Sequence, residues 1–484
     1  MAIPNDIRVP LFYMEFDNSN ANKGIATQQH KILAFGQMTT GTATALEQYR
    51  ITNDDQAKAL FGADSMLAAM VLKLRQSNNY TELWAMPVAE PTGGAAATAT
   101  LTVTGSAAQA GTLALMVAGQ RVHVGVSQGD AAAAVATSIA SAINAVATMP
   151  VSASANAGTV TLTAKWKGLT GNDIDVRLNY YDTDQTPAGL AVVCNTLSGG
   201  AGTIDPTVVI GAMGDEWFNH LVCPYNDQAF LDGLRIELND RWGPLRMMEA
   251  ICYTAYRGNH AATGTWGGNR NDHLITCMGT NLAPNPTWEW AAAYAAQGAY
   301  HLAIDPARPL QTLPLVGIVP PAKRDRWDMV ERNLLLWDGV ATYNVDAGNQ
   351  VLIEREISTY QTNAFGSPDP SYLDITTPAT LGYFRFVHKA HFTQKYPRHK
   401  LADDSVLENL EPGQPVITPK IARVDMLDLF LQLQQKGLVE NFEQYAAELE
   451  VFRDSSNANR LNVVCSPDLI NGLRVMAHQV QFYL

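Results

Sequence analysis

The most metal-like group of side chains in the sequence consists of three histidines, His388, His391 and His399. On a helix, the spacing of the first two would place both imidazole rings on one face, where they could ligate zinc. A zinc site needs a third and a fourth ligand, and no HExxH or CxxC framework accompanies these histidines. Lysines surround them, among them Lys389 and Lys395, and positive charge opposes a bound cation. We therefore expect the histidines to meet solvent or another subunit and not a metal ion.

Other residue types that could support catalysis also lack their usual partners. The segment Gly264–Gly268 is glycine-rich but lacks the Lys-Ser/Thr pair of a phosphate-binding loop, so it is predicted to be a flexible loop. The pairs Asp182/Asp184 and Asp403/Asp404 could act as acids, yet nothing in the sequence places a buried partner beside them to shift a pKa. No G-x-S-x-G motif is present. The sequence thus predicts no catalytic residue, no cofactor-binding residue and no metal ligand.

The composition indicates a large surface that other subunits cover. The chain has 484 residues, of which 47% are hydrophobic and only 16% are charged. Soluble proteins usually carry about 25% charged residues, so either a membrane or other subunits must cover part of the surface. No run of about 18 apolar residues is present, which excludes a membrane-spanning helix and leaves burial by other subunits.

Charge and cysteine content restrict the partners and the compartment. The net charge is −13, so direct binding to the phosphates of a nucleic acid is not expected. The first residues show no basic segment followed by an apolar one, so no secretory signal is predicted. The five cysteines are odd in number and far apart, which is typical of buried thiols in a reducing cytoplasm.

A basic run extends from Lys389 to Lys400 (KAHFTQKYPRHK) and includes Phe392 and Tyr396. Taken alone, alternating basic and aromatic residues are typical of a nucleic-acid contact. In a strongly acidic chain, the run is better explained as a patch that meets an acidic neighbour.

The elements that carry these residues alternate between short apolar strands and amphipathic helices, which predicts an α/β domain from residues 21–90 and 201–338. Asn53, Ser65 and Asp227 stand where helix N-caps are expected. Two later helices are predicted from apolar residues that recur every three or four positions. Residues 323–336 should place Val330 and Leu334 on one face, and residues 419–435 should direct Val424 inward.

Residues 91–200 differ from the rest of the chain, because Ala, Thr, Gly and Ser dominate and only nine side chains are charged. A hairpin is predicted at 111–126 and a helix at 130–147. Low-complexity disorder is the competing interpretation, but the regular spacing of apolar residues argues against it. We predict a β-rich inserted module, bounded by flexible linkers at 91–94 and 199–202.

Both chain ends are predicted to be strand arms, at residues 1–20 and 473–484. Each arm could pair as an edge strand within its own chain or add to the sheet of a neighbour. The residues expected to contact a partner are Ile7, Val9, Leu11, Tyr13, Val475, Met476, Val480, Phe482 and Leu484. The predicted fold class is therefore a mixed α/β, multidomain protein. It has an α/β core domain, an inserted β-rich module, a C-terminal α+β domain at 339–472, and terminal strand arms.

One stretch carries a resemblance to a known family. The runs REISTYQTN (Arg355–Asn363) and DPSYLD (Asp369–Asp374) resemble the C-terminal region of contractile-tail sheath proteins, most closely those of Mu-like phages. The resemblance extends, with less specificity, over most of the chain. Sheath proteins form the sleeve around a phage tail tube and shorten to drive the tube through a bacterial envelope.

The resemblance implies a helical polymer of the chain itself around a tail tube protein, with baseplate and tail terminator proteins as further partners. It implies no cofactor, no nucleic acid and no direct membrane insertion. Arms of different subunits would join a two-stranded hairpin of a third. The inserted module would lie outermost and the C-terminal domain innermost. Four basic residues would then face the tube: Lys389, Lys395, Arg398 and Lys400.

The location implied by the resemblance is the virion tail, assembled in the cytoplasm of the bacterial host. An infectious phage, a prophage and a phage-tail-like bacteriocin would all carry such a chain. A non-contractile virion or surface-layer assembly protein is the alternative, although tail tube subunits are usually much smaller. An enzyme, such as a glycan hydrolase in the inserted module, would need two carboxylates flanking a cleft.

Overall fold

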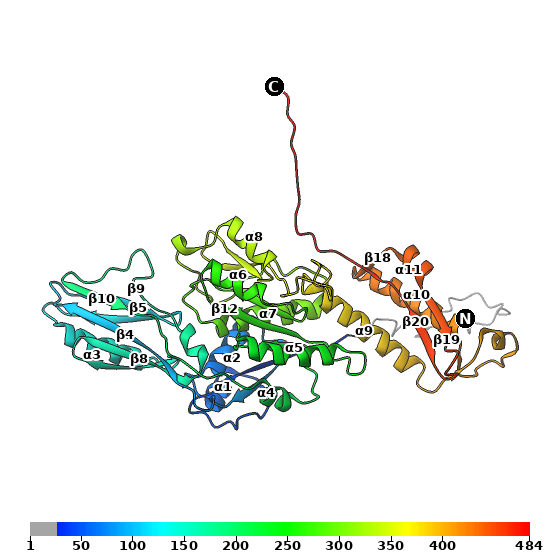
Figure 1. The fold of residues 1–484 in the computed structure, drawn as a ribbon, viewed down its shortest axis with the longest axis horizontal. Coiled ribbons are helices and arrows are strands. Elements are labelled where there is room, and N and C mark those ends of the chain that lie inside the picture. Colours follow the sequence, from blue (N-terminus) through cyan, green and yellow to red (C-terminus); the bar gives the residue numbers. More distant parts are fainter. Residues whose placement is uncertain (1–26) are drawn as a thin grey trace, which may run out of the picture. The chain divides into compact units, whose positions relative to one another are not determined.

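The computed structural model describes residues 27–484, so the N-terminal arm predicted around Ile7, Val9, Leu11 and Tyr13 lies outside the described residues. The described chain divides into two compact units. One comprises residues 29–379 together with 472–484, and the other comprises residues 380–471. Both contain helices and sheets (Figure 1), which confirms the predicted mixed α/β, multidomain fold class.

The first unit is built on a six-stranded sheet with the order β13-β12-β11-β1-β3-β2. All neighbouring strands are parallel except β2, which pairs antiparallel with β3 at one edge. The central strand β1 is buried along most of its length, as expected for a parallel sheet covered on both faces. The strands are β1 (Lys31–Gln37), β2 (Tyr49–Ile51), β3 (Glu82–Val88), β11 (His220–Val222), β12 (Ile251–Tyr256) and β13 (Ile275–Gly279).

Helices of this unit begin where the sequence predicts N-caps. The side chains of Asn53, Ser65 and Asp227 each accept a hydrogen bond from a backbone N–H three residues later. The helices are α1 (Asp54–Phe61), α2 (Met66–Ser77), α4 (Pro206–Met213), α5 (Gln228–Trp242), α6 (His260–Gly268), α7 (Thr287–Ile304) and α8 (Met329–Trp337), with a 3-10 turn η2 (Lys323–Asp325).

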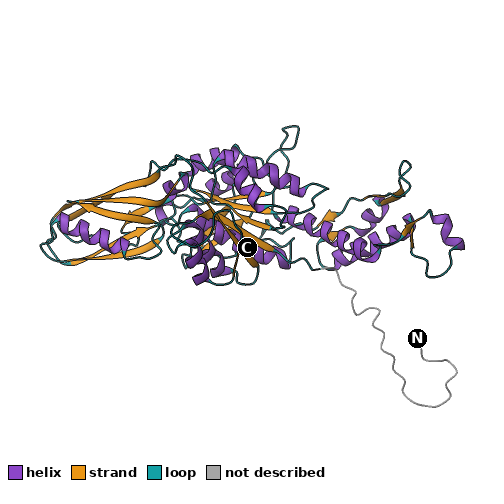
Figure 2. Cartoon of the chain, turned by 90° about the horizontal axis from the view of Figure 1, so that it is seen from below, coloured by secondary structure: helices purple, strands orange, loops and turns teal. Residues whose placement is uncertain are grey.

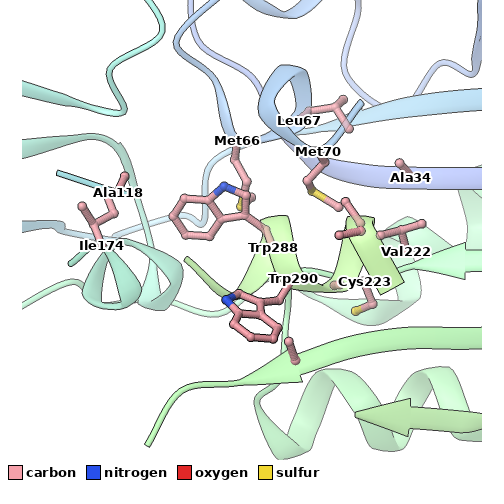
Figure 3. Packing of buried hydrophobic residues seen from close by; sticks show 14 of the residues in the cluster. Ala34, Met66, Leu67, Met70, Ala118, Ile174, Val222, Cys223, Trp288 and Trp290 are labelled. Carbon is pink, nitrogen blue, oxygen red and sulfur yellow. The ribbon is translucent and has the colours of Figure 1, made fainter. Parts of the chain in front are cut away.

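Helix α7 forms the centre of the core, because nearly every residue of this helix is buried. Trp288 lies near Met66 of α2 in Figure 3, with Ala118 and Ile174 of the inserted module to one side. The rings of Trp288 and Trp166 pack edge to face with their centroids 5.4 Å apart. The core therefore continues from the sheet into the inserted module.

The inserted module consists of two sheets, with the orders β10-β4-β8-β7 and β6-β5-β9. Figure 2 shows mainly strands in this region, with α3 beside them. The predicted hairpin is present, and its turn residues Ala118 and Gly119 both have positive φ angles. The elements are β4 (Ala96–Gly105), β5 (Gly111–Val117), β6 (Gln120–Val126), α3 (Ala132–Asn144), β7 (Val151–Asn156), β8 (Thr159–Lys167), η1 (Leu169–Asp173), β9 (Val176–Leu178) and β10 (Leu190–Cys194).

The prediction of flexible linkers at the edges of this module is wrong. The two connections pair with each other, since the N–H of Ala95 donates to the carbonyl oxygen of Ala201 at 2.9 Å. Ion pairs also join the module to the sheet domain, with Arg257 2.6 Å from Asp175 and Lys165 2.6 Å from Asp64. Glycine-rich composition indicated flexibility, but Gly94, Gly200 and Gly202 allow close packing, since a Cβ atom at each would lie less than 3 Å from a neighbouring residue.

Residues 339–379 pack with the first unit, and the division between the two compact units falls at 379/380. The N–H of Thr359 donates to the carbonyl oxygen of Ile275, the first residue of β13, at 2.9 Å. The two strands here, β14 (Thr342–Val345) and β15 (Val351–Arg355), form an antiparallel pair. These backbone contacts link segments that are distant in the sequence.

The second unit contains helices with short strand pairs. Its long helix α10 has the predicted bounds and begins after the Thr418 cap, but Val424 is exposed where burial was predicted. The elements are α9 (Thr376–Lys395, which begins in the first unit), β16 (Lys400–Leu401), η3 (Asp404–Asn409), β17 (Val416–Ile417), α10 (Pro419–Gln435), β18 (Val439–Glu440), α11 (Phe442–Glu448), β19 (Glu450–Arg453), β20 (Leu461–Val464) and β21 (Asp468–Leu469). Among the described residues, no helix is both long and apolar enough to cross a membrane.

Candidate subunit-contact site

The C-terminal arm, residues 473–484, exposes apolar side chains without regular structure. Phe482 is 77% exposed and Tyr483 is 97% exposed, and Val475, Met476 and Val480 are similarly open. Figure 1 draws this segment as an extended trace, and the strand predicted here is absent from the single chain. A strand needs a hydrogen-bonded partner, and no described segment of the same chain pairs with the arm.

The strands β19 and β20 form a two-stranded antiparallel sheet in the second unit. Each strand of such a pair has one edge whose N–H and C=O groups are free to bond elsewhere. The side chains of Phe452, Val463 and Val464 on these strands are exposed. An extended segment could therefore extend this sheet and cover its apolar side chains.

The turn between β19 and β20 is held by Asp454. Its carboxylate accepts hydrogen bonds from the backbone N–H groups of Ser456 and Asn457, both at 2.9 Å, and from the side chain of Asn462. The hydrogen bond from the Ser456 hydroxyl and these further bonds hold the pKa of Asp454 well below its usual range. The hairpin is thus fixed by its own sequence before any partner arrives.

A buried carboxylate, Asp425 on α10, organises the part of the basic run that lies on α9. Lys395 contacts it at 2.7 Å, His391 donates to it at 3.1 Å, and the Tyr396 hydroxyl donates at 2.5 Å. Burial opposes ionisation of Asp425, but these hydrogen bonds outweigh burial and lower its pKa. The charge of Lys395 is therefore largely neutralised within the chain.

The other residues predicted to face the tube remain at the surface. Lys389, Arg398 and Lys400 are exposed, and the Lys400 ammonium donates to the side chain of Gln414 at 3.0 Å. All four basic residues are thus exposed, and Lys395 differs from the other three by its ion pair with Asp425.

The three histidines do not converge on one point. His388 bonds to the carbonyl oxygen of Phe384 at 2.7 Å, His391 bonds to Asp425, and the His399 ring packs against Tyr396. Within residues 27–484, no three His, Cys, Asp or Glu side chains gather as metal ligands.

The prediction of a flexible loop at Gly264–Gly268 is wrong, because these residues belong to helix α6. Asn259 caps this helix, and its small residues allow close packing. A Cβ atom at Gly267 would lie 2.3 Å from the carbonyl oxygen of Asp338. These glycines therefore serve the contact between α6 and the segment that follows α8.

Family models match most of the chain. The model of the phage tail sheath protein central domain covers residues 199–359, and that of the phage tail sheath C-terminal domain covers residues 367–483. The phage tail sheath protein beta-sandwich domain matches residues 92–201. A curated relative, the Mu-like prophage FluMu tail sheath protein of Haemophilus influenzae, is 46% identical over 483 residues, which is 100% of this chain and 99% of the relative.

The chain belongs to the phage tail sheath family.

Solved sheath structures also match, at low identity. The sheath tail proteins of Desulfitobacterium hafniense and Listeria innocua are each 13% identical with a TM-score of 0.49. The match to the first structure covers 95% of this chain and 100% of that structure. The match to the second covers 93% of this chain and 94% of that structure. The helical sheath of the anti-feeding prophage in its contracted state is 9% identical with a TM-score of 0.47, over 99% of both chains.

Membership in the sheath family decides between the functions considered above. The protein is a structural subunit of a contractile tail sheath and part of the tail of a phage-like particle. It is neither the non-contractile assembly protein nor the enzyme that the sequence left as alternatives. The resemblance that Arg355–Asn363 and Asp369–Asp374 suggested is confirmed.

Two features of this sheath subunit were not predicted from the sequence. The first is strand β19, which begins at Glu450 just after α11 ends at Glu448. The polar run from Asp454 to Asn459 between two short apolar segments could have indicated a hairpin. The second is the Asp425 cluster, whose members are about thirty residues apart on two helices and share no sequence motif.

Proposed function

We propose that the C-terminal arm of one sheath subunit adds as a strand to the hairpin β19–β20 of another. The supporting observation is that one chain carries both an unpaired apolar arm and a two-stranded sheet with open edges. Strand addition satisfies the backbone groups of the arm and covers its apolar side chains together with Phe452, Val463 and Val464.

The expected free energy suits a reversible lattice. Each main-chain hydrogen bond contributes about 1 kcal/mol net. Burial of an apolar side chain of the size of Val480 or Phe482 contributes about 1.5–3 kcal/mol. One such contact is modest, and a polymer repeats it at every subunit.

Such a contact joins two different surfaces of the subunit, and it generates a helical polymer when the rotation between neighbouring subunits does not close a ring. The N-terminal residues Ile7, Val9, Leu11 and Tyr13 are proposed to take part in the same exchange. On this proposal the arms stay linked while subunits rotate, and the sheath shortens around the tail tube and drives it through the host envelope.

We further propose that residues 339–472 face the tail tube and that the module 91–200 lies outermost. Exposed Lys389, Arg398 and Lys400 would meet acidic groups of the tube protein, with a smaller contribution from Lys395 because Asp425 neutralises it. Baseplate and tail terminator proteins would bind the two ends of the sheath. Assembly would take place in the cytoplasm of the bacterial host.

Negative-stain microscopy and sedimentation of three purified proteins test the arm contact. The first is the full-length chain, the second lacks residues 475–484, and the third carries Leu334→Ser and Trp337→Ser. The third is a matched control, since it removes exposed apolar side chains on α8 and leaves the arm intact. We expect hollow helical tubes from the first and third proteins, and a folded monomer from the second. Tubes from the truncated protein would place the lattice contacts elsewhere.

A further inference from the structure

Only part of the C-terminal arm is free. The side chain of Arg474 is 12% exposed, although residues 475–484 beyond it are open to solvent. Its guanidinium lies 2.5 Å from Glu356, which is completely buried, and 3.1 Å from Asp374. Arg474 thus joins a charge cluster inside the first compact unit, 118 residues away from its main partner in the sequence.

The backbone next to Arg474 is held as well. The side-chain nitrogen of Gln311 donates to the carbonyl oxygen of Leu473 at 3.3 Å. The side-chain oxygen of Gln311 accepts a hydrogen bond from the Arg474 guanidinium, also at 3.3 Å. A Cβ atom at Gly472 would lie 2.7 Å from the ring of Pro309, so the chain passes close to that proline. Three consecutive residues, 472–474, are therefore fixed before the exposed segment begins.

The two carboxylates of this cluster differ in how many cations they contact. Asp374 also receives a bidentate ion pair from Arg355, with both distances 3.0 Å. Glu356 has no other cation within ion-pair distance among the described residues. A fully buried carboxylate without its cation is strongly unfavourable, so Glu356 retains Arg474 firmly.

We propose that Arg474 is the positioning residue of the C-terminal arm. Its ion pairs attach the root of the arm to the unit that contains the parallel sheet, and only residues 475–484 remain free to reach a second copy. The chain arrives at Gly472 from residues 380–471, yet the arm is fixed to the other unit. Ten free residues in an extended strand span about 33 Å, which limits how far a partner hairpin can lie from Arg474.

In an assembled sheath, the consequence is that force on the arm acts on the sheet-containing unit. Without the anchor, the free segment would begin near Asn471 and gain about 13 Å of slack. This consequence rests on the proposed strand exchange, whereas the anchor itself does not.

The anchor is tested in the unassembled subunit by pulsed EPR distance measurement. Spin labels are placed at Val475→Cys, just beyond the anchor, and at Thr265→Cys on the exposed face of α6, with the partly exposed Cys194 and Cys465 changed to Ser. The wild-type background should give one narrow distance distribution. Arg474→Met should broaden it at least roughly twofold, because up to four more residues become free.

Three further variants keep this test decisive. The double variant Arg474→Met/Glu356→Gln leaves no buried carboxylate without its cation. It replaces Arg474→Met in the distance measurement if the single variant does not fold. Arg474→Lys keeps one charge but cannot reach all partners at once, so it should restore the narrow distribution only in part. Arg332→Met removes a separate ion pair, Arg332 with Glu354 at 2.9 Å, and should leave the distribution narrow.

An unchanged distribution in the double variant would overturn the proposal, and so would equal broadening by Arg332→Met. The same double variant is then examined in assembled tubes by cryo-electron microscopy. We expect tubes with a more variable helical rise than the wild type, and a rise as uniform as the wild type would contradict the mechanical consequence. If the wild-type chain forms no tubes, the strand exchange fails while the EPR result still decides the anchor.

Discussion

Helix α7 and the C-terminal arm are both apolar and poor in charge, yet the side chains of the helix are buried and those of the arm are exposed. Fourteen of the eighteen residues of α7 are buried within the same unit. The apolar residues of the arm are almost fully exposed. Since both segments have similar residue types, the difference lies in whether a partner exists within the chain. The arm is therefore the segment whose partner must come from another subunit.

Among substitutions that test this difference in burial, the largest loss of stability is expected at Trp288. Trp288→Ala removes a side chain that is 1% exposed, and it should destabilise the first unit by about 3–5 kcal/mol. Trp337→Ala is the matched control, because that indole is 76% exposed and its loss should cost less than about 0.5 kcal/mol. Urea unfolding followed by tryptophan fluorescence measures both. Equal effects of the two substitutions would contradict the assignment of burial.

The arm should show the reverse pattern, with no effect on folding and a large effect on assembly. Phe482→Ser with Leu484→Ser should leave the urea midpoint of the free subunit unchanged. Loss of two apolar contacts should raise the concentration needed for polymerisation at least tenfold, because about 1.4 kcal/mol corresponds to a factor of ten. Sedimentation at a series of concentrations measures this threshold. An unchanged threshold would mean that the arm makes no contact between subunits.

A smaller effect is expected at Asp173, whose carboxyl has a raised pKa. Its carboxylate accepts a hydrogen bond from Thr287 at 2.7 Å, and burial raises its pKa to about 6. A carboxyl with a raised folded pKa stabilises the protein most below its unfolded pKa, about 3.9, and this contribution is lost as the pH rises through 6.

Asp173→Asn should therefore stabilise the protein at pH 7.5 by about 1–3 kcal/mol, and the gain should vanish by pH 4. Urea midpoints of the two proteins at both pH values provide the measurement. A variant less stable than the wild type at pH 7.5 would show that the ionised form is the one the fold prefers.

The smallest effect is expected at the hairpin turn. The pKa of Asp454 is held well below its usual range, so its stabilising contribution is present above pH 4 and is lost only as the pH falls through that lowered value. The amide chemical shifts of Ser456 and Asn457 should therefore stay constant between pH 7 and pH 5. Asp454→Ala should move both shifts at every pH. Titration of the wild-type amides near pH 5 would contradict this account of the turn.

Elements whose apolar pattern is long were predictable from the sequence. The helix predicted at residues 419–435 is α10, with the same bounds. Helix α8 begins at Met329 and not at the predicted residue 323, and its residues Val330 and Leu334 are exposed whereas Leu335 is buried. Only Leu335 is buried in this short helix, so the helix has no broad core-facing side. Its exposed apolar residues recur every three or four positions, which is the same spacing that a core-facing side would show.

The candidate site was predictable only in part, because its contacts join distant residues. The sequence predicted a strand arm at residues 473–484 and left its partner open, whereas the structure shows an exposed segment without regular structure. The pairing of Arg474 with Glu356 and the convergence on Asp425 depend on how separate elements pack, and no local pattern encodes them. The ion pair of Lys395 with the buried Asp425 is the reason why a basic run in the sequence is not a uniformly basic surface.

The most direct test of strand exchange between subunits is a cryo-electron microscopy map of tubes assembled from the full-length chain. The account predicts that residues 475–484 form a third strand beside β19 and β20 of another subunit, with Phe482 covered at that contact. A map in which these residues lie on their own subunit, or leave both edges of the hairpin unpaired, would contradict it.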